Sequence, residues 1–153
     1  MILYLDTSAL VKLYVEEEHS DWVHACAAEA EVLATSVVAL PELLSALSRK
    51  RREGALAASD FSRVVEQLGA DWDTLAVAAV QPRRAGDLAT RHPLRGFDAV
   101  HLAAALQFLR EAAGVQGWFL SFDKRLNAAA GEEGLVVKAP QGSLSEPAGW
   151  GGP

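Results

Sequence analysis

Short runs of apolar residues alternate along this chain with longer segments in which apolar positions recur every three or four residues. The short runs predict five strands, at residues 2–6, 32–38, 74–80, 118–123 and 135–139. The longer segments predict helices, at residues 7–18, 20–30, 41–54, 60–70, 83–92, 97–114 and 124–134. Strands that alternate with helices predict an α/β fold, in which a mostly parallel sheet lies between helices.

Local signals mark several helix ends. Thr7 or Ser8 is expected to cap the helix after the first strand, and Pro41 is expected to begin the helix after the second. Gly54 and Gly114 predict the ends of two helices, since glycine readily adopts the left-handed conformation found there. The boundaries of the predicted helices rest on these residues.

Length and composition define the organisation of the chain. Its 153 residues, half of them apolar, suit one domain with one core. We expect this domain to span residues 1–139, followed by a Gly- and Pro-rich tail at 140–153. The single cysteine, Cys26, excludes an internal disulfide and a zinc site of several thiolates. No apolar run reaches the roughly 20 residues of a membrane span, and the lack of a basic, apolar leader favours the cytoplasm.

The net charge of −6, from 14 basic and 20 acidic residues, makes the chain a poor general binder of nucleic acid. Two interpretations remain open on charge alone. Either nucleic acid is not the partner, or bound cations neutralise some of the acidic side chains.

Four acidic side chains stand at the entrances of four predicted elements. Asp6 and Asp123 end the first and fourth strands, whereas Glu42 and Asp98 lie in the first turns of two helices. Functional groups of parallel sheets collect beyond the carboxyl ends of the strands, so these acids are expected to meet there. Crowded carboxylates repel one another, and Mg²⁺ or Mn²⁺, which prefers oxygen ligands, would relieve that repulsion. Such an ion polarises a phosphoryl oxygen and activates water.

Three of these acids also have a purely structural interpretation. Asp6 and Asp98 sit where aspartate commonly caps a helix, and Glu42 interacts favourably with a helix dipole. The catalytic interpretation therefore rests on the four acids together, not on any one of them.

Three supporting side chains accompany the acids. His101 lies one helical turn after Asp98, where it would orient a carboxylate or contact substrate; the alternative is a satisfied core histidine. Ser8 and Ser121 would each hydrogen-bond a carboxylate or a metal-bound water. Their alternative roles are a helix cap and an ordinary strand residue.

A basic run ends the predicted helix at 41–54, and a further arginine precedes Asp98. The run comprises Arg49, Lys50, Arg51 and Arg52, and the further arginine is Arg95. These side chains are candidates for contact with a phosphate backbone or an acidic partner. The alternative is a solvated helix end, which the helix dipole also favours.

Four motifs in this order resemble the PIN domain, and most closely the toxin half of VapBC-type toxin–antitoxin pairs. They read LYLDTSALVKLY, ALPELLSAL, LRGFDAVHLAAAL and FLSFDKRLNAAA, and the resemblance covers residues 1–138. It implies a three-layer α/β/α sandwich with sheet order 3-2-1-4-5. It also implies a Mg²⁺- or Mn²⁺-dependent endoribonuclease whose acidic quartet falls on Asp6, Glu42, Asp98 and Asp123.

The resemblance assigns further roles to these residues. Asp6, Asp98 and Glu42 are expected to hold the metal directly, and Asp123 to complete the site, through water. The family's small hydroxyl near the first acid falls on Ser8; the hydroxyl before the last acid is often threonine and here is serine.

The resemblance also implies a reaction and partners. A metal-activated water would attack an RNA phosphodiester, of tRNA or rRNA for example, and leave 5′-phosphate and 3′-hydroxyl ends. A cognate antitoxin and a homodimer are implied as well. The basic side chains then become candidates for contact with RNA or antitoxin.

Other function classes fit the sequence less well or stay open. A receiver domain needs adjacent acids near the first strand, where Asp6 stands alone, and a dehalogenase-type phosphatase needs a second aspartate where Ser8 stands. A PIN-fold RNA-processing nuclease without an antitoxin and a catalytically silent binding module both remain open.

Overall fold

Five parallel strands form one sheet in the computed structural model, which describes residues 1–140. The strands are β1 (Ile2–Leu5), β2 (Val32–Ser36), β3 (Ala76–Ala78), β4 (Gly117–Leu120) and β5 (Val137–Lys138). Their order is β3-β2-β1-β4-β5, and every neighbouring pair is parallel. The predicted fold class and sheet order are therefore confirmed. The domain boundary at residue 139 stays a prediction, because residues 141–153 of the expected tail lie outside the described part.

Helices occupy most of the chain between the strands. They are α1 (Thr7–Leu10), the 3₁₀ helix η1 (Val11–Leu13), α2 (Ser20–Ala28), α3 (Ala39–Arg52), α4 (Ala58–Trp72), α5 (Pro82–Arg91), α6 (Gly96–Glu111) and α7 (Lys124–Glu132). Among residues 1–140, none of these helices has the length and apolar character that crossing a membrane requires.

Two predicted helix boundaries and one predicted helix cap are wrong. The helix expected at 7–18 stops at Leu10 and tightens into η1, and Asp6 rather than Thr7 or Ser8 caps it. The helix that was expected to begin at Pro41 is α3, which begins at Ala39, so Pro41 is its third residue. A proline is tolerated there because the first N–H groups of a helix have no partner within it.

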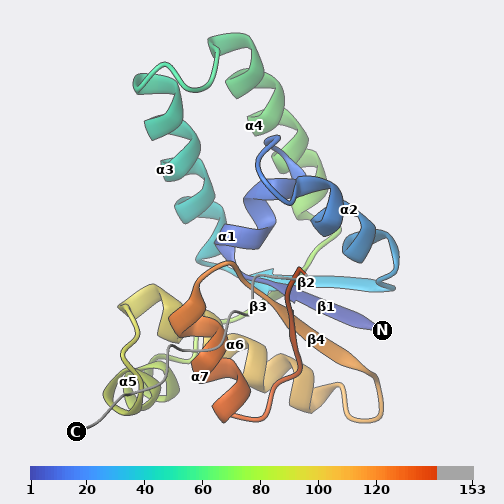
Figure 1. The fold of residues 1–153 in the computed structure, drawn as a ribbon, viewed down its shortest axis with the longest axis vertical. Coiled ribbons are helices and arrows are strands. Elements are labelled where there is room, and N and C mark those ends of the chain that lie inside the picture. The colour runs from blue at the N-terminus through green and yellow to red at the C-terminus, as the bar shows by residue number, and fades with distance from the viewer. Residues whose placement is uncertain (141–153) are drawn as a thin grey trace, which may run out of the picture.

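The sheet separates two apolar cores, and β1 contributes to both. Ile2 and Tyr4 face the core covered by α5, α6 and α7, whereas Leu3 and Leu5 face the core covered by α1 to α4. Figure 1 shows these two helical layers on opposite sides of the sheet. Because successive residues of a strand point to opposite faces, a continuous apolar run such as ILYL suits a strand covered on both sides.

The helices α3 and α4 form an arm that extends away from the sheet (Figure 1). Between them Gly54 has a φ of +76°, in the left-handed region that favours glycine, which confirms the predicted end of α3. The basic run lies in the last turns of α3, on this arm.

A buried lysine connects the start of the chain to this arm. Lys12 is only 8% exposed, and its Nζ lies 3.1 Å from Glu17 Oε2. The other oxygen of Glu17 lies 2.6 Å from Lys50 Nζ on α3. Burial acts to raise the pKa of Glu17, but the hydrogen bonds from Lys50 and Lys12 outweigh it and hold the pKa below its usual value. The single carboxylate of Glu17 thus forms ion pairs with the ammonium groups of both Lys12 and Lys50.

Glu17→Gln should destabilise the fold by about 1 kcal/mol at pH 7, because it leaves the Lys12 ammonium without a carboxylate while solvent still reaches the pair. The pKa of Glu17 is lowered in the folded state, so its stabilising effect is present above the unfolded pKa of about 4.3 and is lost as pH falls through the lower folded pKa. Thermal melts of the wild type, Glu17→Gln and the exposed control Glu16→Gln test this. A difference that stays constant down to pH 3 would contradict it.

Candidate active site

Asp6 is a buried carboxylate at the carboxyl end of the central strand. It follows β1 directly and is 4% exposed. Its Oδ1 accepts hydrogen bonds from Ser8 Oγ at 2.7 Å and from the Ala9 backbone N–H at 3.0 Å, and its Oδ2 accepts from Ser121 Oγ at 2.7 Å. Burial raises the pKa of Asp6, although His101 and these hydrogen bonds act to lower it.

Ser8 and Ser121 join the ends of two neighbouring strands around this carboxylate. Ser8 Oγ accepts from the Phe122 backbone N–H at 2.9 Å, and Ser121 Oγ accepts from the Asp123 backbone N–H at 3.0 Å. Each serine therefore donates to Asp6 and accepts from the segment that leads to Asp123. Both serines therefore contact a carboxylate, and a supporting role in catalysis stays a prediction.

Glu42 is held from two sides in the first turn of α3. Its Oε2 accepts from Thr7 Oγ1 at 2.6 Å and lies 2.9 Å from His101 Nε2. Burial acts to raise the pKa of Glu42, but the hydrogen bonds from His101 and Thr7 outweigh it and lower the pKa. His101 is 2% exposed, so it is both a buried histidine and one that orients a carboxylate.

Thr7 is the residue of this site that sequence reasoning missed. It was assigned only a capping role, which Asp6 performs instead. The signal available was its position directly after Asp6, because a one-turn helix that begins there directs Thr7 toward the same edge of the sheet as the acid.

Asp98 and Asp123 both lie at the starts of helices, a structural role that was expected for Asp98 but not for Asp123. Asp98 Oδ2 accepts from the Arg95 backbone N–H at 3.3 Å. Asp123 Oδ1 accepts from the backbone N–H groups of Arg125 and Leu126 at 2.8 and 2.9 Å. Asp123 lies three residues beyond the last residue of β4, so the prediction that it ends that strand is wrong.

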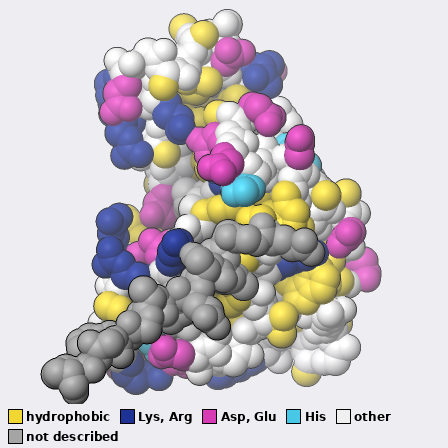
Figure 2. Space-filling view, in the orientation of Figure 1, with side chains coloured by type: hydrophobic (Ala, Val, Ile, Leu, Met, Phe, Trp, Pro, Cys, Tyr) yellow, Lys and Arg dark blue, Asp and Glu magenta, His cyan; other side chains and the backbone are white. Residues whose placement is uncertain are grey.

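Three of the four acids, Asp98, Asp123 and Glu42, nevertheless belong to one electrostatic environment. Burial raises the pKa of Asp98, and the carboxylates of Asp123 and Glu42 raise it further, against the opposing effect of Arg95. Figure 2 shows acidic side chains gathered where the surface is hollowed between the α3–α4 arm and the helices below, with basic side chains on both sides. The carboxylates of Asp123 and Glu42 therefore both repel the carboxylate of Asp98.

The donor set fits a divalent cation, but the ligands are not preassembled. Among residues 1–140, no three His, Cys, Asp or Glu side chains form a group that would hold a metal ion as they stand. Within that range, one oxygen each of Glu42, Asp98 and Asp123 accepts no hydrogen bond, since their recorded bonds use the other oxygen. Carboxylate oxygens are the ligands that Mg²⁺ and Mn²⁺ prefer, and a cation would relieve the repulsion at Asp98.

Some side chains of the basic run have partners within the protein, and others are exposed to solvent. Lys50 is paired with Glu17, and the Arg51 guanidinium lies 4.7 Å from the centre of the Phe61 ring. Arg49 and Arg52 are exposed on the arm, and Arg95 is exposed beside Asp98. Contact with RNA or with another protein stays a prediction for all five.

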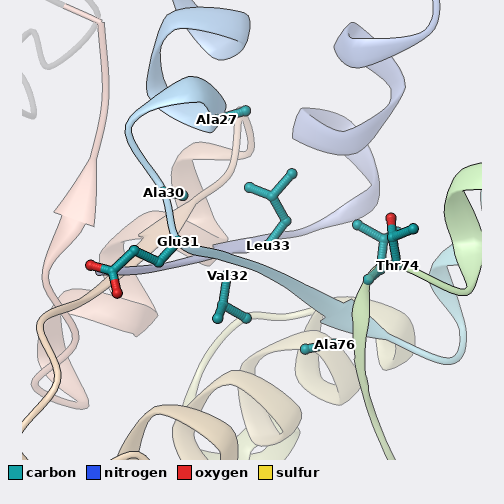
Figure 3. A pocket seen from close by; sticks show the side chains of 8 residues that line it. Ala27, Ala30, Glu31, Val32, Leu33, Thr74 and Ala76 are labelled. Carbon is teal, nitrogen blue, oxygen red and sulfur yellow. The ribbon is translucent and has the colours of Figure 1, made fainter.

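A second hollow, of about 400 Å³, lies at the opposite edge of the sheet (Figure 3). Val32 and Ala76, at the amino ends of β2 and β3, line it together with Leu33 and Thr74. The Glu31 side chain points away from Leu33 and Thr74 and pairs with the amino terminus. This hollow therefore brings none of the predicted site residues together.

Comparison with known proteins identifies relatives. The model of the PIN domain family matches residues 3–132. Ribonuclease VapC45 of Mycobacterium tuberculosis is 35% identical over 144 residues, which cover 92% of this chain and 96% of that protein. The match therefore extends over nearly all of both proteins.

Two solved structures share the fold. The first is VapC20 of Mycobacterium tuberculosis, described as a sarcin-ricin loop cleaving toxin, with a TM-score of 0.63 and 21% identity over 90% of this chain and 99% of that one. The second is VapBC2 of Rickettsia felis bound to a DNA fragment from its promoter, with a TM-score of 0.60 and 14% identity over 90% of this chain and 98% of that one.

Proposed function

The chain belongs to the PIN domain family, as its motifs predicted, and from this we propose that it is a metal-dependent endoribonuclease, the toxin of a VapBC-type toxin–antitoxin pair. One observation carries the proposal: Asp6 is a buried carboxylate at the end of the central strand, and hydrogen bonds through Ser121, Thr7 and His101 connect it with the segments that carry the other three acids. Four helix caps alone would need neither the burial of Asp6 nor the mutual repulsion felt by Asp98.

The proposed site divides the work among its residues. Asp6, Glu42 and Asp98 would hold Mg²⁺ or Mn²⁺, and Asp123 would complete the site through water. When bound, the ion supplies Lewis acidity toward a phosphodiester and an activated water. Ser8 and Ser121 hold the Asp6 carboxylate in place by donating to both of its oxygens. Hydrolysis would leave 5′-phosphate and 3′-hydroxyl ends.

The relatives support the proposed partners. Relatives are named VapC ribonucleases, one structural neighbour is a toxin that cleaves the sarcin-ricin loop, and another is a VapBC complex. We propose rRNA or tRNA as substrate, a cognate antitoxin, a homodimer and a cytoplasmic location. Arg49, Arg52 and Arg95 are the basic side chains available to RNA or antitoxin, since Lys50 and Arg51 have intramolecular partners.

Removal of metal should abolish cleavage. Purified protein incubated with labelled total RNA, tRNA or ribosomes is expected to give discrete fragments with Mg²⁺ or Mn²⁺, none with EDTA, and the same fragments when excess metal is restored, because the bound ion supplies both the Lewis acid and the activated water of the proposed reaction. Mapping of fragment ends tests the predicted 5′-phosphate and identifies the target.

Two outcomes would contradict this proposal. Fragments that persist in EDTA would exclude metal-dependent hydrolysis, and a folded protein that binds RNA without cleaving any of these substrates would favour a silent binding module.

The neighbouring gene distinguishes a toxin from an RNA-processing nuclease. A small reading frame beside this gene that encodes a DNA-binding amino terminus would favour the toxin.

A further inference from the structure

We infer that Tyr4, His101 and Thr7 form a hydrogen-bonded relay that positions Glu42 for cation binding. The relay rests on the proposed function, because Glu42 is a proposed metal ligand. Its members are far apart in sequence: Thr7 is 35 residues from Glu42, and His101 is 97 residues from Tyr4. Thr7 and His101 meet at one carboxylate oxygen of Glu42, and Tyr4 contacts the other nitrogen of His101.

Three atoms of the relay form a closed triangle. Thr7 Oγ1 lies 2.6 Å from Glu42 Oε2, His101 Nε2 lies 2.9 Å from the same oxygen, and Thr7 Oγ1 lies 3.0 Å from His101 Nε2. Two donors are needed to satisfy this geometry. The threonine hydroxyl donates to the carboxylate, so the Nε2 atom must also carry its hydrogen and direct it toward Glu42.

Tyr4 supplies the reason for that arrangement. Its hydroxyl lies 3.3 Å from His101 Nδ1, and the Tyr4 side chain is fully buried. A tyrosine hydroxyl that donates to Nδ1 makes this nitrogen the acceptor, which leaves the hydrogen of a neutral imidazole on Nε2. The Tyr4 ring is itself fixed by stacking on Phe119, with centroids 5.7 Å apart. Tyr4, from the core, thus determines that the imidazole nitrogen that faces Glu42 carries the hydrogen.

The consequence falls on the free oxygen of Glu42. A glutamate on the first turn of a helix has several rotatable bonds, and two donors on Oε2 restrict them. Within residues 1–140 Oε1 accepts no hydrogen bond, so the relay holds one oxygen and presents the other. Partners that orient a metal ligand in this way typically change metal affinity about 10- to 100-fold when removed.

Tyr4→Phe is the sharpest test, because it removes one oxygen atom that touches neither Glu42 nor a cation. We expect it to weaken Mn²⁺ binding about 10-fold, measured by calorimetry or by the EPR signal of free Mn²⁺. Thr7→Val should weaken binding similarly, and Thr7→Ser should restore it. RNA cleavage by these variants should fall at limiting Mn²⁺ and recover at saturating Mn²⁺. Tyr14→Phe, a buried tyrosine in the other core, is the matched control with unchanged affinity.

The outcomes separate the relay from the proposed function. If the wild type neither binds Mn²⁺ nor cleaves RNA, the proposed function fails. If the wild type does both, but Tyr4→Phe and Thr7→Val bind Mn²⁺ as the wild type does and change only the melting temperature, the relay is structural and this inference is overturned. Melting curves confirm that each variant is folded before it is titrated.

Discussion

Asp6→Asn is expected to lower RNA cleavage by roughly 10³-fold or more while the protein stays folded. The reason is that a metal Lewis acid contributes several kcal/mol to a hydrolytic transition state, and each 1.4 kcal/mol changes a rate tenfold. An amide keeps the shape of the carboxylate but not its charge. Cleavage of end-labelled RNA at saturating Mg²⁺ measures the loss, with the exposed Asp87→Asn as control.

The same substitution should leave thermal stability unchanged or raise it. Burial raises the pKa of Asp6 in the folded state. The stability that this side chain contributes is therefore fully present below its unfolded pKa of about 3.9 and is lost as pH rises through the folded pKa. An amide avoids that loss, so the variant should melt at or above the wild-type temperature at pH 7, with a smaller advantage near pH 4.

Two results would contradict this account of Asp6. Cleavage that survives in Asp6→Asn would mean that the site is assigned wrongly. A variant that melts well below the wild type at pH 7 would mean that the hydrogen bonds from Ser8, Ala9 and Ser121 stabilise the anion by more than its burial costs.

Leu102→Ala should cost about 3 kcal/mol of unfolding free energy, a large share of the roughly 5–15 kcal/mol that stabilises a typical domain. Leu102 is fully buried on α6, in the core beneath the sheet. The surrounding alanines cannot collapse into the space that the lost side-chain atoms leave, so a cavity remains. Chemical denaturation measures the change, and Val136→Ala, at a position 59% exposed, is the control expected to lie within about 0.5 kcal/mol of the wild type.

The position of Leu102 links this stability prediction to the site. It follows His101 on the helix that carries Asp98. If the folded Leu102→Ala protein cleaves RNA as the wild type does below its melting temperature, α6 positions its site residues independently of this part of the core. An unchanged denaturation midpoint would contradict the cavity argument.

Local patterns predicted the architecture well because each strand run is apolar throughout. The run ILYLD needed no partner to be recognised, since a strand covered on both faces has no polar side. The first helix was predicted too long because Leu10, Leu13 and Tyr14 have helical spacing, although the chain tightens into η1 at Val11. Lys12 went unnoticed because the carboxylate of Glu17 that pairs with it is also held by Lys50 on α3. No local pattern contains that contact.

The candidate site shows the same division between local and distant information. Asp6 and Asp98 were found because acids at element ends stand out among apolar residues. Thr7 was missed because its partners, Glu42 and His101, are brought to it only by the folded sheet. From the sequence alone, a helix cap and an active-site acid are alternatives for Asp6. In the structure Asp6 caps α1 and also lies at the centre of the candidate site.

The two outer strands of the sheet are its shortest, three residues in β3 and two in β5. A strand at the margin of a sheet exposes unpaired backbone groups that another chain can extend into a longer sheet. Margins this short offer few such groups, so association by strand addition is disfavoured. Any assembly that this chain enters, with a second copy or with another protein, is therefore expected to pack against helices.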